Sequence, residues 1–263
     1  MVFLQRKRPP QPPPPPSPPN PPPRAPRATR TATPDDASSS SAVDDAAALL
    51  AEAGCTLLVP LHQPPALPSP LSFAPRLARA LAAADAALRD RLLAGLAAFA
   101  ESPARLRQLL LPTSAAHSPS LARALLSVPA LQPGLLGLLL DKLPEHFDNV
   151  LDGMPLHDDV GRLIVAQFRW LDFLVDADAF VAKLMEVLSV APPRLKKEII
   201  GSLPEIIGDQ CHATVGAALE KLLQEDSEVV VSALDALSDL NLSEQLQEQV
   251  IITWISFHSD LCC

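Results

Sequence analysis

The sequence predicts an all-α protein, folded as a solenoid of antiparallel helical hairpins. Within residues 162–207, apolar side chains recur every three or four positions through three successive segments, which places them on one face of each helix. The apolar content of 48% comes mainly from Leu, Ala, Val and Ile, which suit packing between helices, whereas only 4% of the residues are aromatic. Runs of β-branched residues are short, so strands are not expected.

The three segments of residues 162–207 each carry one apolar stripe. The stripes are Ile164, Phe168, Leu171 and Val175; Val181, Leu184, Met185 and Leu188; and Leu195, Ile199, Leu203 and Ile206. Residues 176–178 separate the first two segments, and Pro192 and Pro193 separate the second from the third, because proline lacks a backbone donor. Trp170 lies beside the first stripe and is expected to pack into the core.

The N-terminal residues 1–40 are expected to form a disordered, basic, proline-rich tail. Residues 9–34 contain fourteen of the thirty prolines, a composition that favours polyproline II and buries too little apolar surface to offset the entropy of ordering. Such a segment can be a ligand of SH3-like or WW-like domains, although a plain linker is the favoured interpretation. Ordered structure is expected from Ser41, because Ser41 and Asp44 resemble a capping box.

Further helices are expected on both sides of the central segments. Before them, the periodic stretches are residues 46–53, closed by Gly54, then 75–99, a short stretch around Leu106, 118–127 and 134–143. After Gly208 the periodicity continues through two more helices, and a last helix opens at Ser243. The predicted solenoid therefore spans residues 41–250, followed by a divergent C-terminal end at residues 251–263.

One motif recurs after sixty residues. The block Leu143-Pro144-Glu145 returns as Leu203-Pro204-Glu205, and the flanking apolar positions align at the same offset. Self-similarity between helices of this length is typical of HEAT-like or armadillo-like solenoids. We therefore predict that the two blocks occupy equivalent places, each near the C-terminal end of a buried helix.

Several short motifs occur in the order found in the Fanconi anaemia group D2 family. They are Arg162-Leu163-Ile164-Val165, Gln167, Trp170-Leu171-Asp172, Ser189-Val190-Ala191-Pro192 and the block Ile199-Ile200-Gly201-Ser202-Leu203-Pro204-Glu205-Ile206-Ile207-Gly208-Asp209. The looser resemblance spans residues 54–250. In this range the chain resembles the first solenoid segment of that family.

This resemblance implies a non-enzymatic nuclear scaffold of DNA interstrand-crosslink repair, with roles in homologous recombination and meiotic chromosome pairing. Members of the family act with a Fanconi group I paralogue, and the pair closes around double-stranded DNA. The ubiquitin-acceptor lysine of the family lies C-terminal to the matching region, so no lysine of this chain inherits that role. The alternative is a generic HEAT-like adaptor outside DNA repair, organellar if the basic tail is a transit peptide.

The charge is unevenly distributed along the chain. The net charge is −9, yet residues 1–34 hold six basic residues and no acid, which leaves fifteen basic and thirty acidic residues in the rest. An acidic body does not attract DNA as a whole, so a contact with DNA or an acidic partner would need a local basic surface. The densest basic group is the candidate for that surface: Arg162, Arg169, Lys183, Arg194, Lys196 and Lys197.

No pattern in the sequence indicates catalytic, cofactor-binding or metal-binding residues. Phosphate-binding glycine loops and nucleophile motifs are missing. A group of possible metal ligands is better explained as an ordinary interhelical loop; its members are His146, Asp148, Asp152, His157, Asp158 and Asp159. Cysteines without a Cys-x-x-Cys pair indicate a reducing compartment, and no apolar run approaches the ~18 residues of a membrane span. We therefore expect no cofactor, no small-molecule substrate and no membrane contact.

The C-terminal end is expected to be the open edge of a shortened solenoid. Ile251, Ile252, Trp254 and Ile255 place apolar groups on nearly every side of the last helix, as in a helix that is covered on two faces. Inner repeats of a solenoid offer such a surface to the repeat that follows. The alternative is that Leu261 and its neighbours fold back, or that the chain dimerises, to cover this edge.

Overall fold

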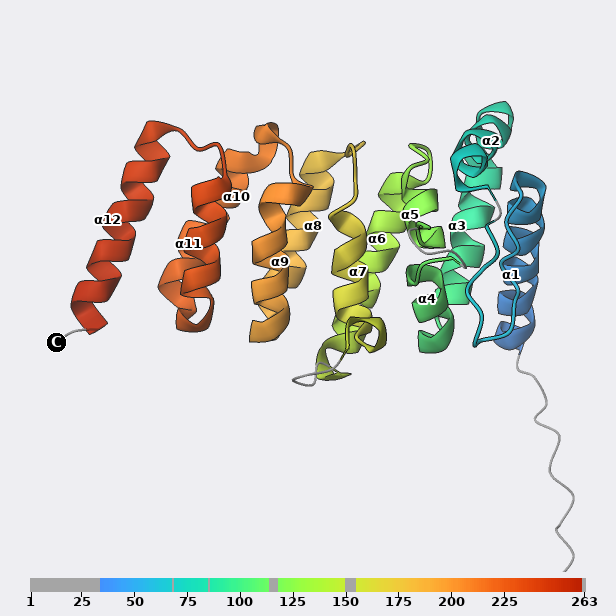
Figure 1. Cartoon of the computed structure of the whole chain (residues 1–263), viewed down its shortest axis with the longest axis horizontal. Helices are drawn as coiled ribbons and strands as arrows, with labels where there is room; N and C mark the ends of the chain where they lie inside the picture. Colours follow the sequence, from blue (N-terminus) through green and yellow to red (C-terminus); the bar gives the residue numbers. More distant parts are fainter. Residues whose placement is uncertain (1–33, 68, 85, 114–117, 150–154, 262–263) are drawn as a thin grey trace, which may run out of the picture.

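The computed structural model describes residues 34–67, 69–84, 86–113, 118–149 and 155–261. Within them, twelve α-helices stack in chain order into an elongated solenoid (Figure 1). The described residues add three short 3-10 helices and two isolated β-bridges, and they contain no strand. The prediction of an all-α solenoid is confirmed.

The helices have the following bounds. The N-terminal half contains α1 (Pro34–Ala53), α2 (Pro70–Ala83), α3 (Ala86–Ala100), α4 (Pro103–Leu110), α5 (Leu121–Leu126) and α6 (Gln132–Lys142). The C-terminal half contains α7 (Val160–Phe168), α8 (Ala177–Val190), α9 (Pro193–Ile206), α10 (Asp209–Glu225), α11 (Val230–Asp239) and α12 (Glu244–Leu261). The 3-10 helices are η1 (Pro144–Asn149), η2 (Leu156–Asp158) and η3 (Ser227–Val229).

From α6 onward the helices alternate between two layers. One layer contains α6, α8, α10 and α12, each packed against the next, and the other contains α4, α7, α9 and α11. Figure 1 shows α7, α9 and α11 side by side in front of α8 and α10. Helices that pack together are thus close in the sequence, as in other solenoids.

The first helix begins earlier than the sequence predicted. α1 starts at Pro34, so Ser41 and Asp44 lie inside it and do not form a capping box. Proline suits the first helical position because its φ is preset and its missing N–H needs no partner there. The tail expected over residues 1–40 therefore overlaps the start of this helix, and residues 1–33 lie outside the described part of the chain.

The end of α1 is the one expected. Gly54 has a φ of +96°, a left-handed conformation that glycine adopts without strain. Its N–H donates to the carbonyl of Ala51 at 3.0 Å, and the N–H of Cys55 donates to the carbonyl of Leu50 at 2.8 Å. These two hydrogen bonds form a Schellman motif, which satisfies carbonyls at the end of the helix.

The periodic stretch of residues 75–99 forms two helices, not the single helix that was predicted. α2 ends because Ala84 is extended, with φ −102° and ψ 171°, and α3 starts at Ala86. Leu81 and Leu92 are both buried, so the periodic leucines still face the core. Neither glycine nor proline marks this break, which is why the pattern did not reveal it.

The repeated blocks are buried, but they are not equivalent. Leu143 and Leu203 are both 0% exposed, near the C-terminal ends of α6 and α9, as predicted. However, α6 packs against α8 whereas α9 packs against α7 and α11, so the two helices lie in opposite layers and the predicted equivalence is wrong. Their local structures differ too, because Pro144 opens η1 whereas Pro204 stays inside α9.

The turn after α7 differs most from the sequence-based prediction. α7 ends at Phe168, and Trp170 is 65% exposed, so the expectation that Trp170 packs into the core is wrong. The buried side chain of Gln132 holds this turn open: its Nε2 donates to the carbonyl of Phe173 at 2.8 Å, and its Oε1 accepts from the N–H of Val175 at 2.7 Å. These contacts join segments far apart in the sequence, and they satisfy two backbone groups of the turn.

Gln132 is one of three buried glutamines whose side-chain amides bind backbone groups of segments far away in the sequence. Gln108 donates to the carbonyls of Pro60 and Gln63 in the loop after α1. Gln167 donates to the carbonyls of Leu163 and Leu110 and accepts from the hydroxyl of Ser120. Each amide satisfies polar groups that are costly to bury without a partner. No helix in the described ranges is both long and apolar enough to cross a bilayer.

Candidate interaction surfaces

The six basic residues of the candidate surface do not share one face. Five of them lie on α7, on the turn after it and on α9, all in one layer; they are Arg162, Arg169, Arg194, Lys196 and Lys197. Lys183 lies on α8 in the other layer, where its Nζ is 2.6 Å from a carboxylate oxygen of Asp141 on α6. Lys183 therefore belongs to a separate contact between α6 and α8.

Two of the five are paired with acids of α9. Arg162 Nε is 3.3 Å from Glu198 Oε2, and the two side chains are only 24% and 30% exposed. Arg169 binds Glu205 through both ends of its guanidinium, with Nε–Oε2 and Nη2–Oε1 distances of 2.8 and 2.6 Å. The hydrogen bonds from Arg169 lower the pKa of Glu205, and those same bonds raise the pKa of Arg169. The pairs link α7 and its following turn to α9, and they reduce the positive charge available to a phosphate backbone.

A third pair links α9 to the start of η3. Lys196 Nζ is 2.9 Å from Asp226 Oδ2, and the side chains are 13% and 20% exposed. The hydrogen bond from Lys196 lowers the pKa of Asp226, which also accepts from the N–H of Glu228 at 3.1 Å. Of the two remaining candidates, Arg194 is half-buried and Lys197 is exposed. The accessible positive charge of this surface is thus concentrated at Lys197.

The variant Asp226→Asn is expected to lower the free energy of unfolding by about 1 kcal/mol at neutral pH, because the mostly buried Lys196 loses its anionic partner. The pKa of Asp226 is lowered in the folded chain, so its stabilisation is fully present above the unfolded value of about 3.9 and is lost as the pH falls through the folded value. Urea unfolding at a series of pH values should therefore show a difference between the two chains that shrinks below about pH 4. A difference independent of pH would contradict this assignment.

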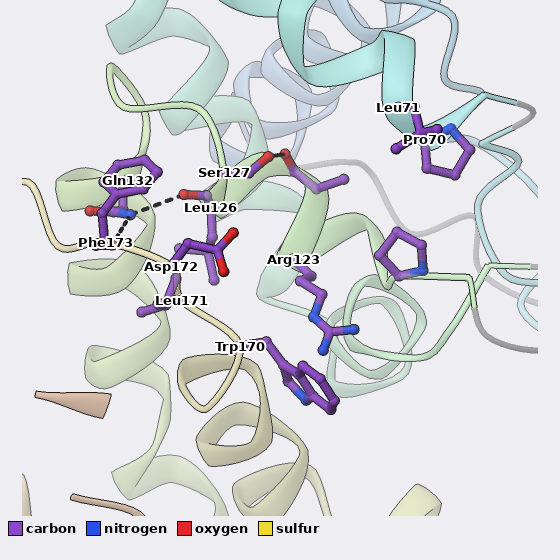
Figure 2. A pocket seen from close by; sticks show the side chains of 12 residues that line it. Pro70, Leu71, Arg123, Leu126, Ser127, Gln132, Trp170, Leu171, Asp172 and Phe173 are labelled. Carbon is purple, nitrogen blue, oxygen red and sulfur yellow. Dashed lines mark hydrogen bonds between the residues drawn. The ribbon is translucent and has the colours of Figure 1, made fainter. Parts of the chain in front are cut away.

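A groove around Trp170 is the second candidate surface. A pocket of about 410 Å³ lies between α2, α5 and the turn after α7, and its lining includes Leu71, Arg123, Trp170 and Phe173. A second pocket of about 400 Å³ is also lined by Arg123 and Trp170, and Leu156 is part of its lining. We call these two pockets and the indole ring shared by them the Trp170 groove. Figure 2 shows the Arg123 guanidinium beside the indole ring, with Pro70 and Leu71 of α2 across the first pocket.

Arg123 holds the indole ring in place. Its guanidinium carbon lies 3.8 Å from the ring centroid, a cation–π contact. Burial lowers the pKa of Arg123, and the nearby Asp172 carboxylate partly opposes this shift. The sequence contains no signal that pairs Arg123 with Trp170, because α5 and the turn after α7 meet only through the tertiary fold.

Two of the possible metal ligands noted in the sequence have other partners. Asp159 caps α7 by accepting from the N–H of Arg162 at 3.0 Å, and Asp158 pairs with Arg107 at 2.7 Å. His146 is buried, which lowers its pKa. Asp152 lies outside the described residues. Within the described part of the chain, no three His, Cys, Asp or Glu side chains come close enough to hold a metal ion.

The chain is similar to proteins of one family. A family model described as "Fanconi anaemia protein FancD2 nuclease" matches residues 32–256. The Fanconi anemia group D2 protein of Gallus gallus is 36% identical over 172 residues, which cover 61% of this chain and 12% of that protein. The Fanconi anemia group D2 protein homolog of Mus musculus is 37% identical over 136 residues, which cover 51% of this chain and 9% of that protein. The chain thus spans about a tenth of the length of these relatives.

The family match is longer than the resemblance seen in the sequence motifs. It begins before Gly54 and continues past Val250, so it includes α1 and reaches into α12. The short motifs of residues 162–209, on which the resemblance was recognised, all fall inside it. Because the match covers far more than half of the sequence, this chain belongs to the FancD2 family.

Proposed function

We propose that this chain is a solenoid segment of a nuclear scaffold for the repair of DNA interstrand crosslinks, acting with a Fanconi group I paralogue on double-stranded DNA. The observation that carries the proposal is the family match over residues 32–256, which includes nearly every described helix. Two layers of stacked helices present long surfaces, as a scaffold requires. The generic HEAT-like adaptor remains the alternative, and it differs in predicting no affinity for the paralogue.

The proposed role is non-enzymatic, although the description of the family model contains the word nuclease. Nucleases that use two metal ions need several carboxylates in one place. Within the described ranges no three His, Cys, Asp or Glu side chains form such a group. Incubating the purified chain with duplex and branched DNA in Mg²⁺ or Mn²⁺ tests the point, since cleavage that survives repurification would contradict it.

The paralogue interaction is tested by mixing the purified chain with a purified Fanconi group I paralogue and measuring the mass of the mixture by light scattering. The proposal expects a stable complex; two separate masses would favour the generic adaptor. Lys197→Glu is the informative variant because Lys197 is the exposed lysine of α9. Lys221→Glu on α10 is the matched control. The Lys221 side chain is 74% exposed, and the substitution changes the charge by the same amount. Loss of binding in the first variant alone would place the paralogue on α9.

Double-stranded DNA is expected to bind weakly to the chain alone. Acids outnumber bases two to one after residue 34, and three of the candidate basic residues are paired with carboxylates on the same face. Fluorescence anisotropy with a short duplex should give a Kd in the non-specific range of about 10⁻⁴–10⁻⁶ M, with a further loss as salt rises. Addition of the paralogue should strengthen binding. Tight, salt-resistant binding by the chain alone would contradict the expectation that the paralogue is needed for strong DNA binding.

A further inference from the structure

The Trp170 groove has the features of a binding site for an apolar, extended segment. Trp170 is 65% exposed, and Leu71 on the opposite wall is 93% exposed, so two large apolar side chains face solvent across one depression. Phe173, at 42% exposed, extends the same apolar surface along the turn. The indole ring is fixed from behind by Arg123, so a ligand would meet a preformed ring surface.

The groove also contains an unmet hydrogen-bond donor. Nη2 of Arg123 is buried and has no hydrogen-bond partner among the described residues, although Arg123 lines both pockets. A buried guanidinium nitrogen without an acceptor is costly, so a shift of the Arg123 side chain that brings Nη2 to an acceptor of a ligand would be favourable. The indole N–H of Trp170 is a second group that can donate and cannot accept.

A proline-rich strand matches this combination of apolar surface and donors. Each proline supplies an apolar ring and a carbonyl oxygen but has no backbone N–H, so the strand brings acceptors without donors of its own. In polyproline II these carbonyls make no internal hydrogen bonds, and the conformation loses little entropy on binding. Grooves lined by aromatic residues recognise such strands in several unrelated domains.

We propose that the Trp170 groove binds the proline-rich segment of this same chain, residues 9–33. This segment carries Arg24, Arg27 and Arg30 and no acid, whereas the chain after residue 34 has twice as many acids as bases. Opposite charge brings the segment to the body, and the exposed Asp172 at the rim of the groove is placed to meet one of the arginines. The net attraction favours the tail over a neutral or acidic proline-rich partner.

The segment is long enough to reach the groove. It joins the chain at the start of α1, a helix of 20 residues and therefore about 30 Å long. α2, which forms one wall of the groove, packs against α1 at the same end of the solenoid (Figure 1). A polyproline II strand advances about 3.1 Å per residue, so the residues between 16 and 33 alone cover about 50 Å. Attachment also holds the segment at an effective concentration on the order of 1 mM, so weak binding is enough.

Fluorescence quenching of Trp170 tests the proposal on the full chain. The substitution Trp254→Phe leaves Trp170 as the only tryptophan, since the sequence has two. In this background, one chain keeps the native tail and a second has every proline of residues 9–33 replaced by serine, which preserves tail length and charge. If the free segment binds with a Kd near 1 mM, about half of the native chains are docked, and acrylamide quenching should rise by up to about twofold in the serine variant. A rise that depends on protein concentration would indicate docking into a second copy and would overturn the proposal.

Titration with a free peptide of residues 9–33 is the second test. Calorimetry should detect binding to the chain with the serine tail and about twofold weaker binding to the native chain, whose groove is occupied in about half of the molecules. Trp170→Ala and Leu71→Ser should each abolish binding to the serine-tail chain; both side chains are exposed, so their loss should leave the fold intact. Val231→Ala, at a 72% exposed residue of α11, is the matched control and should bind normally. Equal quenching of the two tails, or peptide binding that survives Trp170→Ala, would overturn the proposal.

Discussion

Replacing Leu203 by alanine is expected to lower the free energy of unfolding by about 2–5 kcal/mol, because the lost methyl groups leave a cavity that the surrounding helices cannot fill. Leu203 is 0% exposed in α9, which packs between α7 and α11. A cavity at this position therefore loosens two helix-to-helix contacts at once. Urea unfolding followed by circular dichroism gives the difference directly.

Leu171→Ala is the matched control for that experiment. The sequence pattern predicts that both Leu171 and Leu203 are core residues, but Leu171 lies in the turn after α7 and is only partly buried. The same deletion should therefore cost clearly less at Leu171 than at Leu203. A third variant, Arg24→Ala in the tail, should leave the melting temperature almost unchanged. Equal losses at both leucines would mean that the turn after α7 is packed as tightly as α9.

The second large effect is expected at Gly95, where alanine should destabilise the chain by about 1–3 kcal/mol although alanine is the better helix former. A Cβ added to Gly95 in α3 would lie well inside van der Waals contact with the carbonyl oxygen of Ala42 and the Cβ of Ala46 in α1. Neither atom belongs to a flexible side chain, so the two helices would have to separate. Thermal unfolding of the variant measures the cost.

Gly201→Ala is the control for Gly95→Ala, and the opposite sign is expected. Gly201 lies in α9 on the solvent side, and nothing lies within 4 Å of a Cβ added there. Alanine should therefore stabilise the chain by about 0.5–1 kcal/mol, because glycine loses more backbone entropy in a helix. If both variants stabilised the protein, the contact between α1 and α3 would be looser than the structure shows.

The helices could be predicted from the sequence because their cause is local. The side chains of Val181, Leu184 and Leu188 can all face the same core only if the segment is helical. The three residues are buried as expected. The layer in which each helix lies is not local information. The repeat of Leu143 and Leu203 predicts structural equivalence, but α6 and α9 pack into different layers of the solenoid.

The candidate site was the hardest part to predict. The basic residues were visible as a group, yet the acids that pair with them, such as Glu205 and Asp226, are 36 and 30 residues away in the sequence. Trp170 was assigned to the core because it follows a buried stripe. It is exposed because α7 ends at Phe168 and the chain then enters a turn, in which Gln132 binds the backbone of Phe173 and Val175. A glutamine carries no sequence signal for such a contact.

The buried glutamines have a consequence for the way this solenoid opens. The amide hydrogen of Val175 belongs to an irregular turn, yet it is held by Gln132 at the start of α6 and can exchange with solvent only when that contact breaks. Gln108 of α4 binds the loop after α1 in a similar way, through the carbonyls of Pro60 and Gln63, so this loop shares the opening free energy of α4. The cooperative units of unfolding therefore consist of a helix together with a distant turn, and they cross the boundaries of the hairpins seen in the chain order.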